Sequence, residues 1–329
     1  MKSLARAAGA AAVVVLLAAC DLPFGLGLPT IQALNRGAGD SLDAANSFRI
    51  AGFYTESATV WKMDLEMVKP GSEHVLLSSQ DVNLEAIATA GRSYFRGRQF
   101  LVSHMGSDPY SQSLVQAAGN NWWTGLPAAA PATLTDFTTG SSLSSTFLGT
   151  AVTSRTDHVS VGGVPAIELS GPRADVFLSE APPYRVMRIH VKKGALVDGV
   201  STADFVYSDF GRDFAIAAPA GALNFADLST LPPVYTVLSV DTSGCAFPCE
   251  VSASLKNLGG KSGGRAPSTV KFTMTDPQTN TVLGDCQVAV PPDVGHSATT
   301  TVSCTIAGVN GADHNAAVVT ATADSSGVG

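Results

Sequence analysis

The chain has 329 residues, of which 45% are apolar and 14% are charged, and its formal net charge at pH 7 is −7. This acidic balance lacks the surplus of Lys and Arg with which proteins bind nucleic acid, so composition argues against nucleic acid as a partner. A chain of this length is expected to form two domains.

The first twenty residues, MKSLARAAGAAAVVVLLAAC, have the features of an export signal. Lys2 and Arg6 precede an apolar run over residues 7–19 that is too short to span a bilayer comfortably. Residues 17–20, LAAC, resemble a bacterial lipobox, which implies cleavage before Cys20 and attachment of acyl chains such as palmitate. The alternative is an ordinary signal peptide with an unrelated cysteine.

We therefore expect a lipoprotein signal peptide over residues 1–19 and a lipidated tether over residues 20–29. Two or more acyl chains hold a protein at a membrane, whereas one chain binds only weakly. The predicted location is the cell envelope, at the outer face of the cytoplasmic membrane, with the membrane bound through acylated Cys20.

Residues 30–231 predict a mainly β domain with a few helices. A helical pattern over residues 30–45 is followed by short alternating runs separated by turn signals, which favour an antiparallel meander. The clearest run is residues 61–68, WKMDLEMV, in which large apolar and charged side chains alternate and so occupy opposite faces of a strand. Helical spacing over residues 99–148 interrupts the strands, which resume near residue 150.

This order of elements, with the segments VGGVPAIELSG, ADVFLSE, PPYRVMRIHVKKG and ADFVYSDFGRDFAIAAPAG, resembles the LolA-like half-barrel. It is most similar to the LppX/LprG branch of acyl-anchored lipoproteins. The resemblance covers roughly residues 30–225. It implies a strongly curved antiparallel sheet whose concave side, lidded by helices, forms an apolar cavity for lipid chains.

The apolar face of these strands has two interpretations. A sheet that packs only on its own helices would show the same alternation. A cavity is favoured by several methionines, which suit adaptable apolar surfaces, and by more inward apolar surface than the few helical segments are expected to cover. The predicted lipid-cavity residues are Phe48, Ile50, Trp61, Met63, Leu65, Met67, Leu77, Leu84, Phe95, Ile167, Leu169, Val176, Leu178, Met187, Ile189, Val191 and Phe205.

Trp122 and Trp123 have two interpretations as well. They are amphipathic residues suited to the mouth of a cavity, or they make core contacts under the helices.

A second domain is predicted after a linker over residues 232–245. Residues 246–329 are rich in Val, Thr, Ser and Gly and contain short strand-like runs, with a turn predicted at residues 257–260. SASLKNLGGKSG, VKFTMTD and SCTI resemble bacterial Ig-like modules, so we expect a small Ig-like β-sandwich.

The four cysteines after Cys20 predict disulfides, because an even number in an exported chain commonly forms a disulfide framework. Cys286 and Cys304 lie symmetrically about Gly295, which predicts that they face each other on a hairpin. Cys245 would then close a small loop with Cys249. A zinc site is the competing idea, disfavoured by the spacing and the oxidising location.

Catalytic and metal-binding patterns are weak. Residues 39–42 spell GDSL, the nucleophile block of a lipase family, and Asp293 with His296 gives a DxxH. The segment before this serine is a polar helical stretch rather than a buried strand, so we predict no enzyme. The six histidines have no ligand spacing, and we predict neither a metal nor a cofactor.

The function predicted from the sequence is binding of acyl lipid or glycolipid and its carriage within the envelope. The alternative is a non-enzymatic interaction or sensor module that binds an envelope protein partner through the half-barrel and the Ig-like domain.

Overall fold

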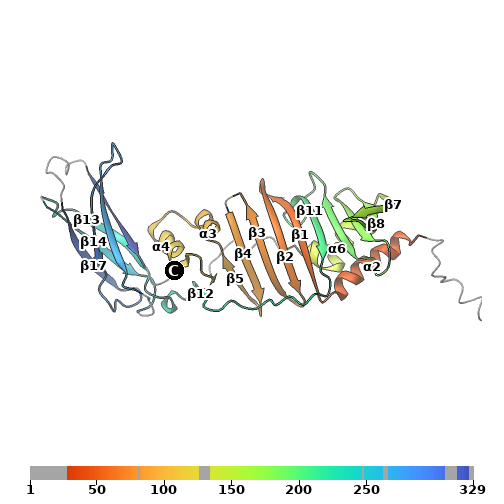
Figure 1. Cartoon of the computed structure of the whole chain (residues 1–329), viewed down its shortest axis with the longest axis horizontal. Helices are drawn as coiled ribbons and strands as arrows, with labels where there is room; N and C mark the ends of the chain where they lie inside the picture. Colours follow the sequence, from red (N-terminus) through yellow and green to blue (C-terminus); the bar gives the residue numbers. More distant parts are fainter. Residues whose placement is uncertain are drawn as a thin grey trace, which may run out of the picture.

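A computed structural model describes residues 28–80, 82–125, 134–246, 248–261, 266–307 and 317–325. The signal segment and Cys20 lie outside these residues. The described chain forms one large curved sheet followed by two small sheets (Figure 1). This confirms the predicted fold class, a mainly β structure with a curved antiparallel half-barrel, helices and a smaller β domain.

The large sheet has twelve strands in the spatial order β12-β6-β5-β4-β3-β2-β1-β11-β10-β9-β8-β7. Two antiparallel meanders, β1–β5 and β7–β11, meet where β1 pairs with β11, and the short β6 and β12 pair in parallel. The strands are β1 (Ser47–Glu56), β2 (Thr59–Val68), β3 (Ser72–Ser79), β4 (Val82–Thr89), β5 (Arg92–Arg96), β6 (Trp123–Thr124), β7 (Ser154–Val161), β8 (Val164–Ser170), β9 (Ala174–Ser179), β10 (Val186–Val191), β11 (Ser201–Ser208) and β12 (Leu223–Asn224).

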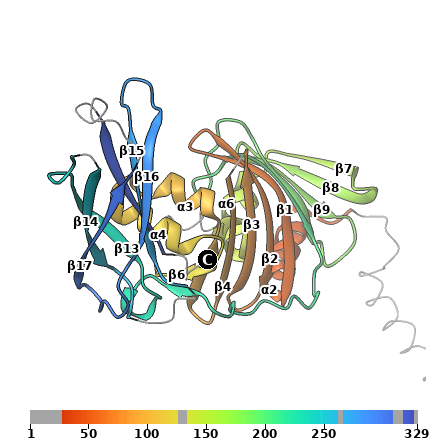
Figure 2. The same cartoon turned by 60° about the vertical axis from the view of Figure 1, so that its left-hand side comes forward.

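The helices form two groups on this sheet (Figure 2). In one group α2 and α5 both pack against α6, which contacts β9. In the other, α3 packs on β4 and on α4, which in turn contacts the second domain. The α-helices are α2 (Ile31–Ala44), α3 (Arg98–His104), α4 (Pro109–Ala118), α5 (Thr135–Thr138) and α6 (Gly140–Phe147), and two 3-10 turns follow at Gly149–Ala151 and Leu228–Thr230.

Local capping explains where two of these helices begin. The hydroxyl of Thr30 accepts the backbone N–H of Ala33 at the start of α2. The carboxylate of Asp108 accepts the N–H of Ser111 at the start of α4, and Pro109 occupies the first helical position, where no N–H is needed.

The GDSL segment lies inside α2 and has a packing role. A Cβ on Gly140 of α6 would lie 2.1 Å from the carbonyl oxygen of Gly39, so only glycine lets the two helices approach this closely. Leu42 is fully buried, and the hydroxyl of Ser41 donates to the carbonyl of Ala38 within the helix. Helix packing therefore accounts for these residues.

The second domain has two three-stranded sheets, β13-β14-β17 and β16-β15-β18. Its core is separate from the core of the large sheet and takes side chains from both small sheets, among them Val251, Leu255 and Phe272. The strands are β13 (Tyr235–Asp241), β14 (Cys249–Asn257), β15 (Thr269–Thr275), β16 (Val282–Ala289), β17 (Thr299–Ile306) and β18 (Val318–Asp324).

Both predicted disulfides are present, but the reason given for one of them is wrong. Cys245 is bonded to Cys249, and Cys286 is bonded to Cys304. Strands β16 and β17 do not form a hairpin, because each pairs within a different sheet. The Cys286–Cys304 bond therefore joins the two sheets across the domain.

The junction between the domains is built around one buried amide. Asn257 is fully buried, and its Oδ1 accepts the N–H of Val234 while its Nδ2 donates to the carbonyl of Val294 at 2.7 Å. A Cβ on Gly259 would lie 2.0 Å from the carbonyl oxygen of Pro232. The segment predicted as a turn, residues 257–260, therefore packs against the chain entering the second domain, and the range 232–245 predicted as a linker contains β13.

Candidate functional site

The concave face of β1–β5 is built in rows of cross-strand neighbours. One row is Ile50, Leu65, Val75, Ala86 and Phe95, each paired with the next across the sheet. The row on one side of it is Phe48, Met67, Glu73, Ala88 and Ser93, and the row on the other side includes Met63, Leu77 and Leu84. Because side chains alternate along a strand, the residues between these rows face outward.

Helices fill one half of the bowl. Phe137 of α5 is fully buried, and its ring meets Phe205 edge-on at 5.0 Å and Phe147 of α6 at 5.3 Å. The hydroxyl of Tyr207 donates to the backbone carbonyl of Phe137 at 2.8 Å. Leu143 is also fully buried. The concave face of β8–β11 is thus covered by the protein's own side chains.

The other half, over β1–β5, is hollow. A first cavity of about 270 Å³ lies between this sheet and α5, lined by Tyr54, Met63, Leu65, Glu73, Val75, Leu77, Ala86, Ile87, Ala88, Ser93, Phe95, Leu134, Thr135 and Thr138. A second, of about 620 Å³, lies beside α3 and the β1–β2 turn. Tyr54 and Leu77 line both cavities, so the two adjoin.

We call these adjoining cavities the β1–β5 trough. It runs along the strands, from Trp61 in the second cavity to the row of Met67 and Glu73 at the end of the first. Trp61 and Met67 are six residue steps apart along β2, which gives a length of ~20 Å at the usual rise per residue. That length exceeds the ~15 Å hydrocarbon thickness of one bilayer leaflet. An extended hydrocarbon chain fits this dimension.

Two polar side chains face the first cavity without a partner. Neither Glu73 nor Tyr54 makes a side-chain hydrogen bond or ion pair within the described ranges, although Tyr54 is only 2% exposed. Burial raises the pKa of the Glu73 carboxyl, and burial together with the charge of Glu56 raises the pKa of Tyr54. Both side chains therefore have hydrogen-bonding capacity for a molecule in the cavity.

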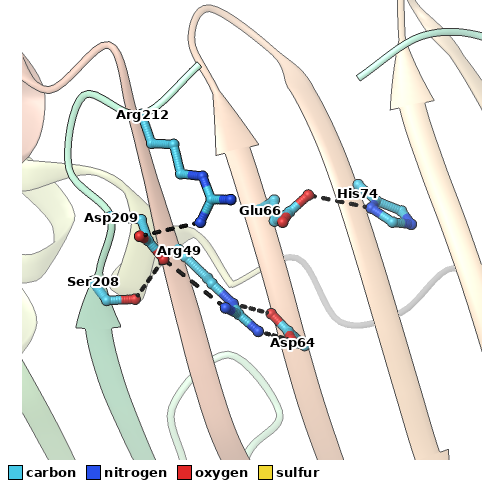
Figure 3. A network of polar contacts seen from close by, with 7 residues as sticks. All are labelled: Arg49, Asp64, Glu66, His74, Ser208, Asp209 and Arg212. Atoms are coloured by element: carbon cyan, nitrogen blue, oxygen red, sulfur yellow. Dashed lines mark hydrogen bonds and ion pairs between the residues drawn. The ribbon is translucent and has the colours of Figure 1, made fainter. Parts of the chain in front are cut away.

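The convex face carries a network of polar contacts on β1, β2 and β3 (Figure 3). Arg49 on β1 donates to Asp64 on β2 at 2.6 Å and lies 3.9 Å from Asp209. Further along the sheet, His74 lies between Glu66, at 3.4 Å, and Glu85, at 2.9 Å. These contacts pair Arg49 and His74 with carboxylates on the neighbouring strands.

Glu85 is a carboxylate on the convex face whose pKa is lowered by its hydrogen-bond partners. Burial alone would raise the pKa of Glu85, but hydrogen bonds from Arg96 and His74 outweigh burial and hold that pKa below its usual value. Glu73, on the concave face, has no such partner among the residues described, and its pKa moves in the opposite direction.

The structure places the predicted lipid-cavity residues in two groups. Around the trough lie Trp61, Met63, Leu65, Leu77, Leu84 and Phe95. Buried elsewhere in the same core are Phe48, Ile50, Met67, Ile167, Leu169, Val176, Leu178, Ile189, Val191 and Phe205.

Met187 is the exception to this burial. A bulge between Val186 and Arg188 shifts the pairing of β10 with β9, so Val186 is buried and Met187 is only half-buried. Cys20 lies outside the described residues.

The two tryptophans have different surroundings. Trp123 is fully buried in β6 and pairs with Phe95, whereas Trp122 is half-buried beneath the guanidinium of Arg96, 4.7 Å from its ring. Neither lines the trough. The core-contact interpretation fits Trp123.

The weak catalytic pattern is not assembled into a single site. Ser41 lies on α2 of the first domain, and Asp293 and His296 lie in the second domain, where the His296 Nδ1 is 3.1 Å from the carbonyl oxygen of Gly259. Across the described ranges, no three His, Cys, Asp or Glu side chains are grouped as metal ligands. Over the same part of the chain, no helix is long and apolar enough to cross a membrane.

Comparison with models of known protein families finds no match, and comparison with curated proteins finds none either. Among solved structures, "Crystal structure of MucB in complex with MucA(peri)" is similar over 89% of this chain and 92% of that chain, with 12% identity and a TM-score of 0.26. "The complex structure of Pseudomonas aeruginosa MucA/MucB" is similar over 84% and 93%, with the same identity and TM-score. These values assign neither a ligand nor a partner to this chain.

Sequence reasoning missed three residues of the trough that matter for its chemistry: Glu73, Tyr54 and Ala86. A signal for Glu73 was present, because it has the same strand parity as Val75 and Leu77 and must share their face. The small side chain of Ala86 leaves space in the middle row, and only the packed structure shows that no helix of the described ranges fills it.

Proposed function

We propose that this chain is a lipoprotein of the cell envelope that binds acyl lipid or glycolipid in the β1–β5 trough and carries it between envelope sites. The observation that supports this most directly is the contrast within one bowl. Aromatic residues of α5 and α6 fill the half over β8–β11, whereas the half over β1–β5 contains the two cavities.

The energetics give such a trough a use. Exposure of one methylene to water costs about 0.8 kcal/mol, so an unassisted sixteen-carbon chain faces a barrier on the order of 10 kcal/mol. An apolar trough removes much of that cost while the chain is away from the bilayer. Acylation of Cys20 would keep the carrier beside the membrane that supplies and receives the lipid.

The test is to fill the trough without unfolding the protein. Ala86→Phe places a large side chain in the first cavity, where space is available, and should retain the fold. Val206→Phe is the matched control, because Val206 lies on the convex face of β11 and is 44% exposed. Both substitutions are made in the full chain carrying Cys20→Ala, so that any lipid found is held by the trough.

Native mass spectrometry then measures co-purified lipid. We expect acyl lipid on the parent and on the Val206→Phe protein, and its loss from the Ala86→Phe protein with an unchanged circular dichroism spectrum. Lipid retained by folded Ala86→Phe would show that the trough is not the binding site, and no lipid on any of the proteins would favour the alternative, an interaction module for an envelope protein. The proposal includes no catalytic step.

A further inference from the structure

Among the described residues that line the first cavity, one carries a carboxyl group and the others are apolar or neutral. We propose that Glu73 selects the ligand's head group: it accepts a hydrogen bond from a hydroxyl or ammonium head, and it rejects a head that is itself a carboxylate. This inference rests on the proposed function, because it names the class of amphiphile that the trough takes.

The position of Glu73 is fixed by the sheet. It pairs with Met67 on β2 and Ala88 on β4, and Ala88 pairs in turn with Ser93 on β5. Two strand positions away, Val75 lines the same cavity. The carboxyl therefore lies at one end of the trough, between apolar neighbours on β2 and β4, with the hydroxyl-bearing Ser93 two strands away on β5.

Glu73 has no cation beside it within the described chain. On the opposite face Glu85 receives hydrogen bonds from Arg96 and His74. Nothing comparable reaches Glu73, and its half-buried position raises its pKa. A carboxyl in apolar surroundings without a partner destabilises the folded state unless a hydrogen-bond donor reaches it.

The rest of the lining defines the kind of donor. Ser93, Thr135 and Thr138 add hydroxyl groups to this cavity, and none of the described residues that line it is a Lys, Arg or His. A free fatty acid would place its carboxylate in a cavity whose one carboxyl group repels it and whose lining offers no cation. A neutral alcohol or an amine with the same chain meets an acceptor at its head and apolar rows along its tail.

The experiment compares three probes with one twelve-carbon chain: dodecanol, dodecylamine and dodecanoate. Each displaces the neutral dye N-phenylnaphthylamine from the full chain carrying Cys20→Ala, near neutral pH. Glu73→Gln tests the head-group contact. Glu168→Gln is the matched control, because this substitution makes the same change of charge at a residue on the convex side of β8, away from the trough.

We expect dodecanol and dodecylamine to bind at least ~10-fold more tightly than dodecanoate. A tenfold difference requires about 1.4 kcal/mol, and a hydrogen bond to a charged carboxyl together with the absence of charge repulsion exceeds that amount. Glu73→Gln should remove most of this preference, and Glu168→Gln should keep it. Equal binding of all three probes to the parent, or a preference that survives Glu73→Gln, overturns the head-group inference while supporting an apolar trough. Failure of every probe to bind overturns the proposed function itself.

Discussion

Phe137 is a fully buried side chain in the filled half of the bowl, and Phe137→Ala measures how much its packing contributes to stability. The ring is fully buried between Phe147 and Phe205, and its helix α5 also supplies Thr138 to the first cavity. Removing the ring leaves a void in the filled half and weakens the attachment of α5. The substitution should therefore lower stability and loosen one side of the trough.

The magnitude follows from the burial. Truncation of a fully buried phenylalanine to alanine costs ~3–5 kcal/mol, and this site is at the upper end because two aromatic contacts are lost together. At ~2–4 °C per kcal/mol for a domain of about 200 residues, the midpoint of thermal unfolding should fall by roughly 6–20 °C. Phe53→Ala is the matched control: Phe53 is 45% exposed on β1, and its loss should change stability by less than ~0.5 kcal/mol.

Urea unfolding followed by circular dichroism measures both variants. The transition of the first domain should move for Phe137→Ala, while the second domain, which has a separate core, should unfold as in the parent. A decrease in the free energy of unfolding below ~1 kcal/mol for Phe137→Ala would refute the reasoning, because removal of a fully buried aromatic side chain is expected to destabilise the domain by more than that.

Three further predictions concern charges and the disulfide. Glu73→Gln should raise the thermal midpoint near pH 7 but not near pH 4. Because the pKa of Glu73 is raised, the folded state holds this proton more tightly than the unfolded state, so stability falls as pH rises from the ordinary carboxyl pKa through the raised one. Glutamine does not titrate, so the variant lacks this fall in stability. Replacing Cys286 and Cys304 by alanine should lower the stability of the second domain by ~3 kcal/mol, because the disulfide closes a loop across 18 positions and joins two sheets. Urea unfolding should show this loss in the transition of the second domain alone. An equal shift in the first domain would contradict the independence of the two cores. Asp64→Asn should lower the free energy of unfolding by no more than ~1 kcal/mol, and this loss should shrink in high salt, since the ion pair with Arg49 is partly exposed. A loss of stability that does not depend on salt would contradict this reasoning.

Much of the candidate site follows from strand parity. The alternation in residues 61–68 predicted that Met63 and Leu65 share one face, and they do so in the first cavity. Parity failed to place Met187, because a bulge in β10 changes which residue faces inward. A bulge depends on how a strand pairs with its neighbours, so the alternation of apolar and polar residues within one strand does not predict it.

The sequence by itself determined the fold class and the faces of most strands, because these depend on local periodicity. The cysteine pairs were also predicted correctly, but from a hairpin that the structure does not contain. Tertiary structure alone decided that β16 and β17 belong to different sheets, that the glycine of GDSL is a helix contact, and that α5 and α6 fill only one half of the bowl. Whether apolar surface is covered depends on where distant helices come to lie and how much volume their side chains fill, and that is a property of packing in three dimensions.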